Sequence, residues 1–435
     1  MKILYHHRIR SKDGQYVHLE ELVAALRAMG HEVRIVGPEA VGNAAFGSDA
    51  GLVAWMKRRI PKALYEIIEL GYGVFAYLRL ARAIRAFRPD GIYERYNLFL
   101  PSGVWAKRRF GLPLLLEVNS PLYAERKRFD GIALDALARW SERTAWRGAD
   151  AVLPVTEALA ELVTRETGSQ QRISVIPNGI NTEHFSAALD CDAVRKRWKL
   201  EDRLVLGFTG FVREWHGLDR VIASLAADAP ERRRMLIVVG DGPARAGLQA
   251  QARSLGISER VVFTGVVARE DVPAHVACFD IALQPAVVAY ASPLKLFEYL
   301  ALGRAIVAPL QPNICEVLTD NVNALLFDPA VPDALAAAID RLSDDAALRK
   351  RLAAGARNTI GERGLTWARN AERVTALFES LVTRAHASAV AGVERDHASL
   401  AADACVMRLA RQSAEHSDGA QRGVEQGVPG IRKSA

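Results

Sequence analysis

Residues 176–181 read Ile-Pro-Asn-Gly-Ile-Asn, a strong turn signal that interrupts a regular pattern in the 435-residue chain. Before it, short apolar stretches alternate with helical ones, and the same alternation begins again after a charged helix expected at 192–200. Strands alternating with helices predict a parallel sheet with helices on both faces. We therefore predict an α/β protein of two doubly wound, Rossmann-like domains that face a cleft, joined near residue 190. Ligands of such folds bind beyond the carboxyl ends of the strands.

The expected strands are short and apolar. They lie at 2–5, 32–36, 91–94, 113–118 and 151–155, and then at 204–208, 235–239, 261–263, 281–283 and 305–307. The first strand is followed by a helix expected at 14–30. A chain of this length is too long for one core and suits two.

Composition excludes several classes of protein. Half of the chain is apolar and a quarter is charged, as in an ordinary globular protein. The cysteines Cys191, Cys278, Cys315 and Cys405 have no paired spacing, so we expect neither a disulfide framework nor a zinc site, and a cytoplasmic location. The first five residues read as a strand instead of a signal peptide, and no apolar run is long enough to cross a bilayer.

Basic residues gather between 57 and 88, interleaved with large apolar ones. The two sets are Lys57, Arg58, Arg59, Lys62, Arg79, Arg82, Arg85 and Arg88, and Trp55, Ile60, Leu64, Ile67, Ile68, Phe75, Tyr77 and Leu78. One interpretation is a peripheral contact with the inner face of a membrane, where apolar burial and charge attraction add. The other, which we favour, is a pair of solvated amphipathic helices packed on a core. The net charge of +7 comes with no nucleic-acid recognition motif, so we expect no nucleic-acid partner.

Residues 290–304 read Tyr-Ala-Ser-Pro-Leu-Lys-Leu-Phe-Glu-Tyr-Leu-Ala-Leu-Gly-Arg and predict a helix with an anion-binding start. Ser292 is a good N-cap, Pro293 suits the first helical position, and Gly303 is a natural stop. A helix start carries free N–H groups and partial positive charge, which favour a phosphate. Glu298 lies beside Lys295, more than a turn further along, where it could accept hydrogen bonds from ribose hydroxyls. The alternative is a capped, largely buried helix that binds nothing.

Loops after other expected strands offer further candidates. Gly14 precedes a helix and would let backbone approach a phosphate, or it is part of a plain turn. In the loop 209–217, Arg213 could bind an oxyanion through two hydrogen bonds and His216 could add a donor. The alternatives are a surface salt bridge for Arg213 and a water-facing histidine at a helix start.

Two short motifs follow later strands. The turn 240–243, Gly-Asp-Gly-Pro, is interpreted as structural. In 262–265, Val-Phe-Thr-Gly, backbone groups could contact a base, although we favour a plain strand end.

Together these motifs resemble those of the GT-B glycosyltransferases, specifically the retaining family 4, over about residues 1–383. The resemblance is carried by 176–185, Ile-Pro-Asn-Gly-Ile-Asn-Thr-Glu-His-Phe, by the motifs at 240–243 and 262–265, and by 292–299, Ser-Pro-Leu-Lys-Leu-Phe-Glu-Tyr.

The resemblance implies a hexosyltransferase that moves a sugar from a nucleotide diphosphate to a glycan or lipid-linked acceptor with retained configuration. The context would be cell-surface polysaccharide or glycolipid synthesis. Such enzymes usually hold no metal, so we expect no cofactor beside the sugar-nucleotide substrate. The implied domains are an acceptor-binding domain at 1–188, a nucleotide-sugar-binding domain at 189–362 and a crossover helix at 363–385 that packs on the first domain. Residues 386–435 have few large apolar groups and predict a disordered tail.

The resemblance also assigns roles to residues. Glu298 falls on the second glutamate of the family's Glu-seven-residues-Glu pattern and would bind ribose, whereas Tyr290 takes the place of the first. Phe211 and His216 replace the family's usual Arg and Lys. The implied catalytic residues are Asn119, where many members have a histidine near the transferred sugar, and Arg213 and His216.

The implied donor-binding residues come from several loops. They are Gly14, Gly210, Arg213, Gly240, Gly242, Thr264, Ser292, Pro293, Leu294, Lys295 and Glu298. In the crossover helix, Trp367 is placed at the domain junction, with an ordinary core tryptophan as the alternative.

Two other functions stay open at this point. A GT-B nucleotide-sugar epimerase would share the cleft but needs acid–base groups around the sugar. The replaced Arg and Lys pair is also consistent with a non-catalytic sugar-nucleotide-binding protein, because fold alone does not decide function.

Overall fold

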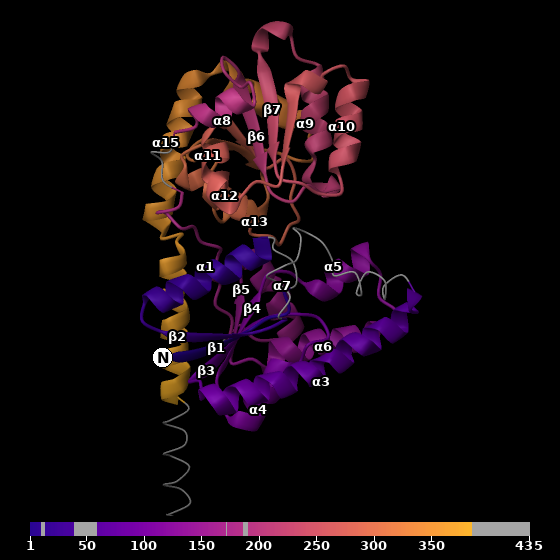
Figure 1. Ribbon diagram of the computed structural model, residues 1–435, viewed down its shortest axis with the longest axis vertical. Coiled ribbons are helices and arrows are strands. Elements are labelled where there is room, and N and C mark those ends of the chain that lie inside the picture. Colours follow the sequence, from indigo (N-terminus) through magenta and orange to yellow (C-terminus); the bar gives the residue numbers. More distant parts are fainter. Residues whose placement is uncertain (10–13, 39–58, 171, 186–189, 385–435) are drawn as a thin grey trace, which may run out of the picture. The chain divides into compact units, whose positions relative to one another are not determined.

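The computed structural model describes residues 1–9, 14–38, 59–170, 172–185 and 190–384 (Figure 1). Residues Met1–Phe378 form one compact unit. The predicted tail at 386–435 lies outside the described residues, as do Trp55, Lys57 and Arg58.

The first lobe is built on a parallel sheet, which has five strands within the described residues, in the order β2-β1-β3-β4-β5. The strands are β1 (Lys2–His6), β2 (Glu32–Val36), β3 (Gly91–Arg95), β4 (Leu114–Val118) and β5 (Ala151–Pro154). The helices are α1 (Gly14–Ala28), α3 (Lys62–Phe87), α4 (Ser102–Phe110), α5 (Leu122–Phe129), α6 (Asp135–Gly148) and α7 (Glu157–Thr167). Figure 1 shows α1 on one side of this sheet and α3 and α4 on the other.

The second lobe repeats the plan with a parallel sheet of six described strands, in the order β11-β10-β9-β6-β7-β8. The strands are β6 (Leu204–Thr209), β7 (Arg234–Val239), β8 (Val261–Gly265), β9 (Ile281–Leu283), β10 (Ala305–Pro309) and β11 (Leu325–Phe327). The helices are α8 (Asp192–Arg197), α9 (Leu218–Ala226), α10 (Arg245–Ser254), α11 (Val272–Ala277), α12 (Leu294–Ala301), α13 (Pro312–Cys315), α14 (Ala334–Asp344) and α15 (Ala346–Arg363). Two doubly wound sheets confirm the predicted fold class.

The helix predicted at 290–304 forms, but its predicted start is wrong. α12 begins at Leu294, so Pro293 occupies the N-cap position and no side chain caps the helix. The hydroxyl of Ser292 is buried without a hydrogen-bond partner. Ser292 lies one residue too early because the chain is still extended at Pro293, with φ −70° and ψ 119°. The predicted stop is confirmed, since Gly303 takes a positive φ of 58°.

Two segments of the chain connect the lobes, and they lie side by side. Ile180 forms an isolated parallel bridge with Thr366, and a Cβ on Gly179 would lie 2.6 Å from the backbone nitrogen of Trp367. Only glycine permits this approach of two backbones.

The residues after this junction return to the first lobe. They are helical from 367 to 378, and the indole of Trp367 lies edge-on to the His18 ring at 4.8 Å. Further along, Thr375 hydrogen-bonds His31 at 2.9 Å. The predicted crossing of a C-terminal helix onto the N-terminal domain is therefore confirmed.

The second lobe holds α12 in place through a fully buried aromatic side chain. Phe297 is 0% exposed in the apolar cluster that also contains Leu300 and Ile306. Phe297→Ala is expected to lower the free energy of unfolding by about 3–5 kcal/mol, because it removes the ring and leaves a cavity. Urea unfolding followed by tryptophan fluorescence measures this. Leu255→Ala, at a side chain that is 44% exposed, is the control and should change it by less than about 0.5 kcal/mol. Equal effects would contradict the assignment of α12 to the core.

Candidate functional site

A cleft of about 1080 Å³ receives side chains from both lobes. It lies beyond the carboxyl ends of several strands, where a doubly wound fold binds its ligands. Most of the residues singled out from the sequence line it: Gly14, Asn119, Gly210, Arg213, His216, Gly240, Ser292, Pro293, Leu294, Lys295 and Glu298.

Gly242 and Thr264 are not among the lining residues. A Cβ on Gly242 would lie 2.2 Å from the carbonyl oxygen of Val212, so this glycine allows two loops to pack. The Thr264 hydroxyl donates to the carbonyl of Gly265 at 2.8 Å. Both residues have structural roles at the edge of the second sheet.

Lys295 and Glu298 lie one helical turn apart on α12 and both face the cleft. Burial lowers the pKa of Lys295 to about 7, although the charge of Glu298 acts in the opposite direction. The Lys295 ammonium lies 3.6 Å from the centroid of the Phe208 ring. Burial likewise raises the pKa of Glu298 to about 7, against the charges of Lys295 and Arg269.

The buried Glu298 Oε2 has no hydrogen-bond partner. Most buried polar atoms in folded proteins are hydrogen-bonded, because an unsatisfied one costs free energy. An unpaired carboxylate oxygen that faces a cleft is therefore ready to accept hydrogen bonds from a bound hydroxyl-bearing molecule.

The loop after β6 carries a short 3-10 turn, η2 (Glu214–His216), with Arg213 just before it. The Arg213 guanidinium lies over two rings, those of Phe211 at 4.7 Å and Trp215 at 4.8 Å. Stacking leaves the edge of the guanidinium able to donate hydrogen bonds. Arg213 thus keeps a positive charge at the cleft in a loop that is rich in aromatic residues.

His216 lines the cleft and does not simply face bulk water. Its Nδ1 accepts a hydrogen bond from the backbone N–H of Arg213 at 3.2 Å, which leaves Nε2 as the donor of the neutral ring. Burial, with the charges of Lys295 and Arg213, lowers the pKa of His216 to about 2. His216 therefore offers a neutral donor at physiological pH and does not replace a cation.

Glu117 holds several side chains of the first-lobe wall of the cleft in place, and it is 2% exposed. Its carboxylate accepts from the Tyr93 hydroxyl at 2.9 Å, from the Arg95 guanidinium and from the Asn119 side-chain amide. Burial alone would raise the pKa of Glu117, but the charges of His18 and Arg95 outweigh it and lower that pKa well below its usual range. Glu117 stays ionised and orients the amide of Asn119.

His18 connects this carboxylate to the second lobe. Its Nε2 lies 3.1 Å from Glu117 Oε2, and its Nδ1 lies 2.8 Å from Asn178 Oδ1. The amide of Asn178 in turn donates to the carbonyl oxygen of Ser292 at 2.6 Å. The two ring nitrogens of His18 thus face two oxygen atoms, one on Glu117 and one on Asn178.

Tyr290 contacts the first lobe. Its side chain packs against the core of the first lobe, and its carbonyl oxygen accepts from the Thr156 hydroxyl at 3.0 Å. Burial, followed by the charge of Glu125, raises the pKa of Tyr290 to about 12.

Ion pairs also join the two lobes beside the cleft. Arg269 of the second lobe pairs with Glu20 at 2.6 Å and with Glu21, both on α1.

Sequence reasoning did not single out His18, Arg95 or Glu117. One signal was available for Glu117, which precedes Asn119 by two residues in an extended stretch, so both side chains point the same way. His18 carries no comparable signal, because its partners lie about 100 and 160 residues away along the chain.

Comparison with known proteins identifies the family. Residues 13–179 match the family model described as "Glycosyl transferase 4-like domain", and residues 191–359 match "Glycosyl transferases group 1". The chain belongs to the family 4 GT-B glycosyltransferases.

The curated relatives of this chain that are described below are glycosyltransferases. The chain is 27% identical over 259 residues to the alpha-D-kanosaminyltransferase of Streptomyces kanamyceticus, which covers 57% of this chain and 66% of that protein. It is 26% identical over 352 residues to the GDP-mannose-dependent alpha-mannosyltransferase of Mycobacterium tuberculosis, covering 77% and 85%. The match to the kanosaminyltransferase thus spans slightly less than two thirds of that protein's length.

Solved structures share the fold. Anabaena Alr3699/HepE in complex with UDP and glucose has a TM-score of 0.69 at 20% identity, covering 87% of this chain and all of that one. WaaG, a glycosyltransferase involved in lipopolysaccharide biosynthesis, has a TM-score of 0.64 at 16% identity, covering 87% and 99%.

The raised pKa of Glu298 makes the stability of the ligand-free protein depend on pH. Between its ordinary value of 4.5 and its folded value of about 7, the folded state binds more protons than the unfolded state. Stability contributed at this site therefore falls as pH rises through that window and stays low above pH 7.

Glu298→Gln is expected to stabilise the protein by about 1–3 kcal/mol at pH 8 and by much less at pH 4.5, because it removes the buried charge. Urea unfolding at the two pH values measures the difference. Glu259→Gln, at an exposed carboxylate, should show no such dependence. A gain from Glu298→Gln that is the same at both pH values would contradict the raised pKa.

Proposed function

We propose that this protein is a retaining hexosyltransferase that moves a sugar from a nucleotide diphosphate to a glycan or lipid-linked acceptor. The observation that carries the proposal is the buried, unpaired Glu298 Oε2, which faces a cleft entered by both lobes, one turn beyond Lys295. Its cellular role is the synthesis of a cell-surface polysaccharide or glycolipid.

The donor binds to the second lobe, with its diphosphate at the start of α12. Free backbone N–H groups and the partial positive charge of this helix start face the cleft at Leu294 and Lys295. The Lys295 amine, whose pKa is lowered to about 7, takes up a proton when the phosphates arrive, since a nearby negative charge favours the ammonium. Glu298 accepts hydrogen bonds from the ribose hydroxyls.

Transfer breaks the bond between the anomeric carbon and the phosphate oxygen and forms a bond to the acceptor oxygen. The acceptor hydroxyl gives its proton to the departing phosphate oxygen, and the nucleoside diphosphate leaves with the remaining negative charge. Lys295, Arg213 and the α12 start stabilise that charge where it develops. His216 adds a neutral donor, and Asn119, held by Glu117, contacts the transferred sugar from the first lobe.

We propose that the two lobes bind different substrates and that the domain limits separate these two roles. Residues 1–188 bind the acceptor, 189–362 bind the donor and 363–385 form the crossover helix, whereas the reaction does not need residues 386–435. The protein works in the cytoplasm at the inner face of the membrane. None of the described helices is both long and apolar enough to cross a bilayer.

Donor identity can be tested by thermal unfolding in a panel of UDP- and GDP-sugars. Both bases are included because one solved neighbour is complexed with UDP-glucose and one relative is GDP-mannose-dependent. A donor that binds only the folded state raises the unfolding temperature. The same donors are then incubated with and without a lipid-linked acceptor, and the anomeric configuration of the product is read by NMR.

Nucleotide release only with acceptor, and a product with the donor's configuration, support the proposal. Interconversion of the donor sugar without acceptor would instead show an epimerase. Binding without either reaction would show a sugar-nucleotide-binding protein, and an inverted product would contradict retention.

Glu298→Ala is expected to weaken donor binding by roughly 10- to 100-fold, the loss expected for hydrogen bonds to a charged group. Isothermal titration with the donor found above measures the affinity. Glu259→Ala is the matched control, because it removes an exposed carboxylate of the same lobe. Unchanged affinity for Glu298→Ala, in a protein that unfolds at the normal temperature, would count against the ribose contact.

A further inference from the structure

Helix α3 exposes a row of large apolar side chains. Leu64, Ile67, Ile68, Val74, Phe75 and Leu78 are each between 40% and 59% exposed. They recur at spacings of three, four and seven residues, which places them on one face of the helix. Between Leu64 and Leu78 the row is about 21 Å long, at 1.5 Å per residue.

The opposite face of α3 is the one that packs on the core. Tyr65, Ala76, Leu80 and Ile84 are buried there. The favoured prediction of amphipathic helices packed on a core is confirmed for this side of α3. On the other side, Leu64, Ile67, Ile68, Phe75 and Leu78, which the sequence showed interleaved with basic residues, are exposed.

Both acidic residues of α3 are on the inner side. Glu66 is fully buried and accepts from the backbone N–H groups of Ala133 and Leu134 at 3.0 and 2.7 Å. Glu69 is 9% exposed and pairs with Arg8 at 3.3 Å and with Arg126 at 2.5 Å. The exposed face of α3, a helix described throughout its length, therefore carries no carboxylate.

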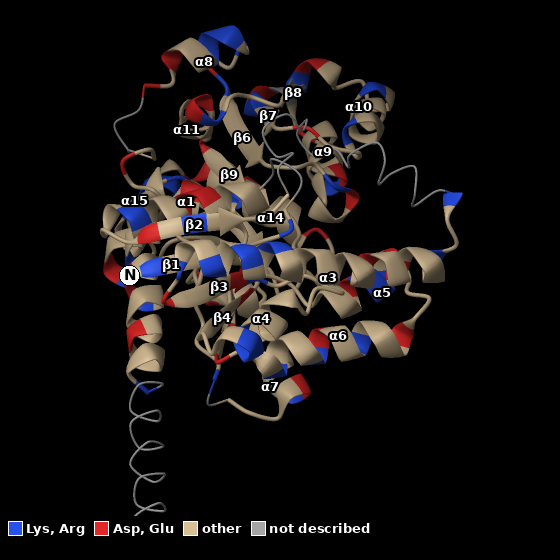
Figure 2. Cartoon of the chain, turned by 60° about the horizontal axis from the view of Figure 1, so that its bottom comes forward, with Lys and Arg blue, Asp and Glu red and all other residues tan. Residues whose placement is uncertain are grey.

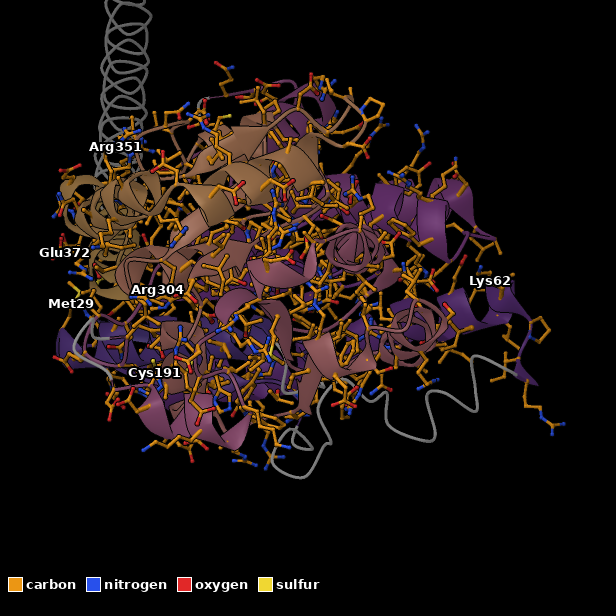
Figure 3. All side chains as sticks on the ribbon, turned by 90° about the horizontal axis from the view of Figure 1, so that it is seen from above. Met29, Lys62, Cys191, Arg304, Arg351 and Glu372 are labelled. Atoms are coloured by element: carbon orange, nitrogen blue, oxygen red, sulfur yellow. The ribbon has the colours of Figure 1, made fainter. Side chains whose placement is uncertain are left out.

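Three arginines continue the exposed face toward the C-terminal end of the helix. Arg82 follows Leu64 by 18 residues, which is five full turns, and Leu78 by four, so it points the same way. Arg79 and Arg85 flank it at three residues on either side, and Arg82 and Arg85 are exposed. Figure 2 shows the blue bands of α3 gathered in one half of the helix. Figure 3 labels Lys62, where α3 begins, at the edge of the molecule.

We propose that the exposed face of α3 binds an anionic lipid surface. The apolar row enters the boundary between headgroups and acyl chains, and the arginines pair with lipid phosphates. A second copy of the chain fits this face less well. It would set the arginines of one α3 against an apolar or cationic partner face, and neither supplies the carboxylates that would offset their desolvation.

This inference deepens the proposed location at the inner face of the membrane by naming the surface that makes the contact, and it does not depend on glycosyl transfer. It assigns the contact to the first lobe, the lobe proposed to hold the acceptor.

The test is flotation of the full chain with vesicles of phosphatidylcholine and phosphatidylglycerol, compared with vesicles of phosphatidylcholine alone. The wild-type protein should bind the anionic vesicles at least tenfold more tightly, and binding should weaken as salt is added, because salt screens the arginines.

Two variants separate the two parts of the face. The triple variant Arg79→Gln, Arg82→Gln and Arg85→Gln should bind anionic vesicles roughly 100-fold less tightly, at about fivefold for each charge. The triple variant Ile67→Ser, Phe75→Ser and Leu78→Ser should lose at least as much, since it removes the inserted apolar area. Phe75→Leu, which keeps an apolar side chain, should retain binding.

A charge-matched control is available on the second lobe. Lys196→Gln, Lys199→Gln and Lys350→Gln removes three exposed cations and should leave vesicle binding within about threefold of wild type, as expected for charges far from the contact. All these substitutions except Arg79→Gln are at exposed positions, and thermal unfolding checks that each variant is folded.

Four results would overturn the proposal. They are failure of the wild-type protein to float with anionic vesicles, wild-type binding by the serine variant, wild-type binding by the arginine variant, and an equal loss in the control. A lipid-free dimer that the serine variant dissociates, seen by light scattering together with no vesicle binding, would show that the face joins two copies instead.

Discussion

The hydrogen bond between His18 and Asn178 is the contact on which the candidate site depends. His18 lies on α1 of the first lobe, and Asn178 lies in the segment that leads to the second. Through Asn178 the contact reaches the carbonyl of Ser292, two residues before α12, and through Glu117 it reaches Asn119. The His18 imidazole thus connects both walls of the cleft. It packs against Trp367, where the chain returns to the first lobe.

The second feature of the site is that it holds charges at a cost in stability. Lys295 and Glu298 are buried without enough partners. The pKa of Lys295 is therefore lowered and that of Glu298 is raised, each to about 7, which favours the neutral form of both groups. Burial is the larger cause of both pKa shifts, and the charge of each group offsets the effect of burial on the other only in part. A ligand could bring the missing partners, namely anionic oxygens for the amine and hydroxyl groups for the carboxylate. The same logic explains why substituting Glu298 should both stabilise the protein and weaken its ligand binding.

Much of this arrangement could be predicted from the sequence, and the failures have physical reasons. Strand and helix alternation predicted both sheets, because buried parallel strands need runs of apolar residues whatever lies around them. The cap at Ser292 was wrong, since the backbone at Pro293 stays extended and only three-dimensional packing sets where the helix begins. Gly242 and Thr264 match the family motif but support loop packing and a strand end. The pattern of α3 could not tell which of its two apolar faces would be covered.

The sequence by itself determined the two-lobed α/β architecture, the position of α12 and the residues that could bind an anion and a sugar. These depend on local rules, such as hydrophobic periodicity and turn chemistry, which act over a few neighbouring residues. Only the tertiary structure decided that Glu117, His18, Asn178 and Ser292 form one connected chain, and that one face of α3 stays exposed. Those outcomes depend on contacts between segments about 100 residues or more apart and on which surface the rest of the fold covers, and no local pattern contains that information.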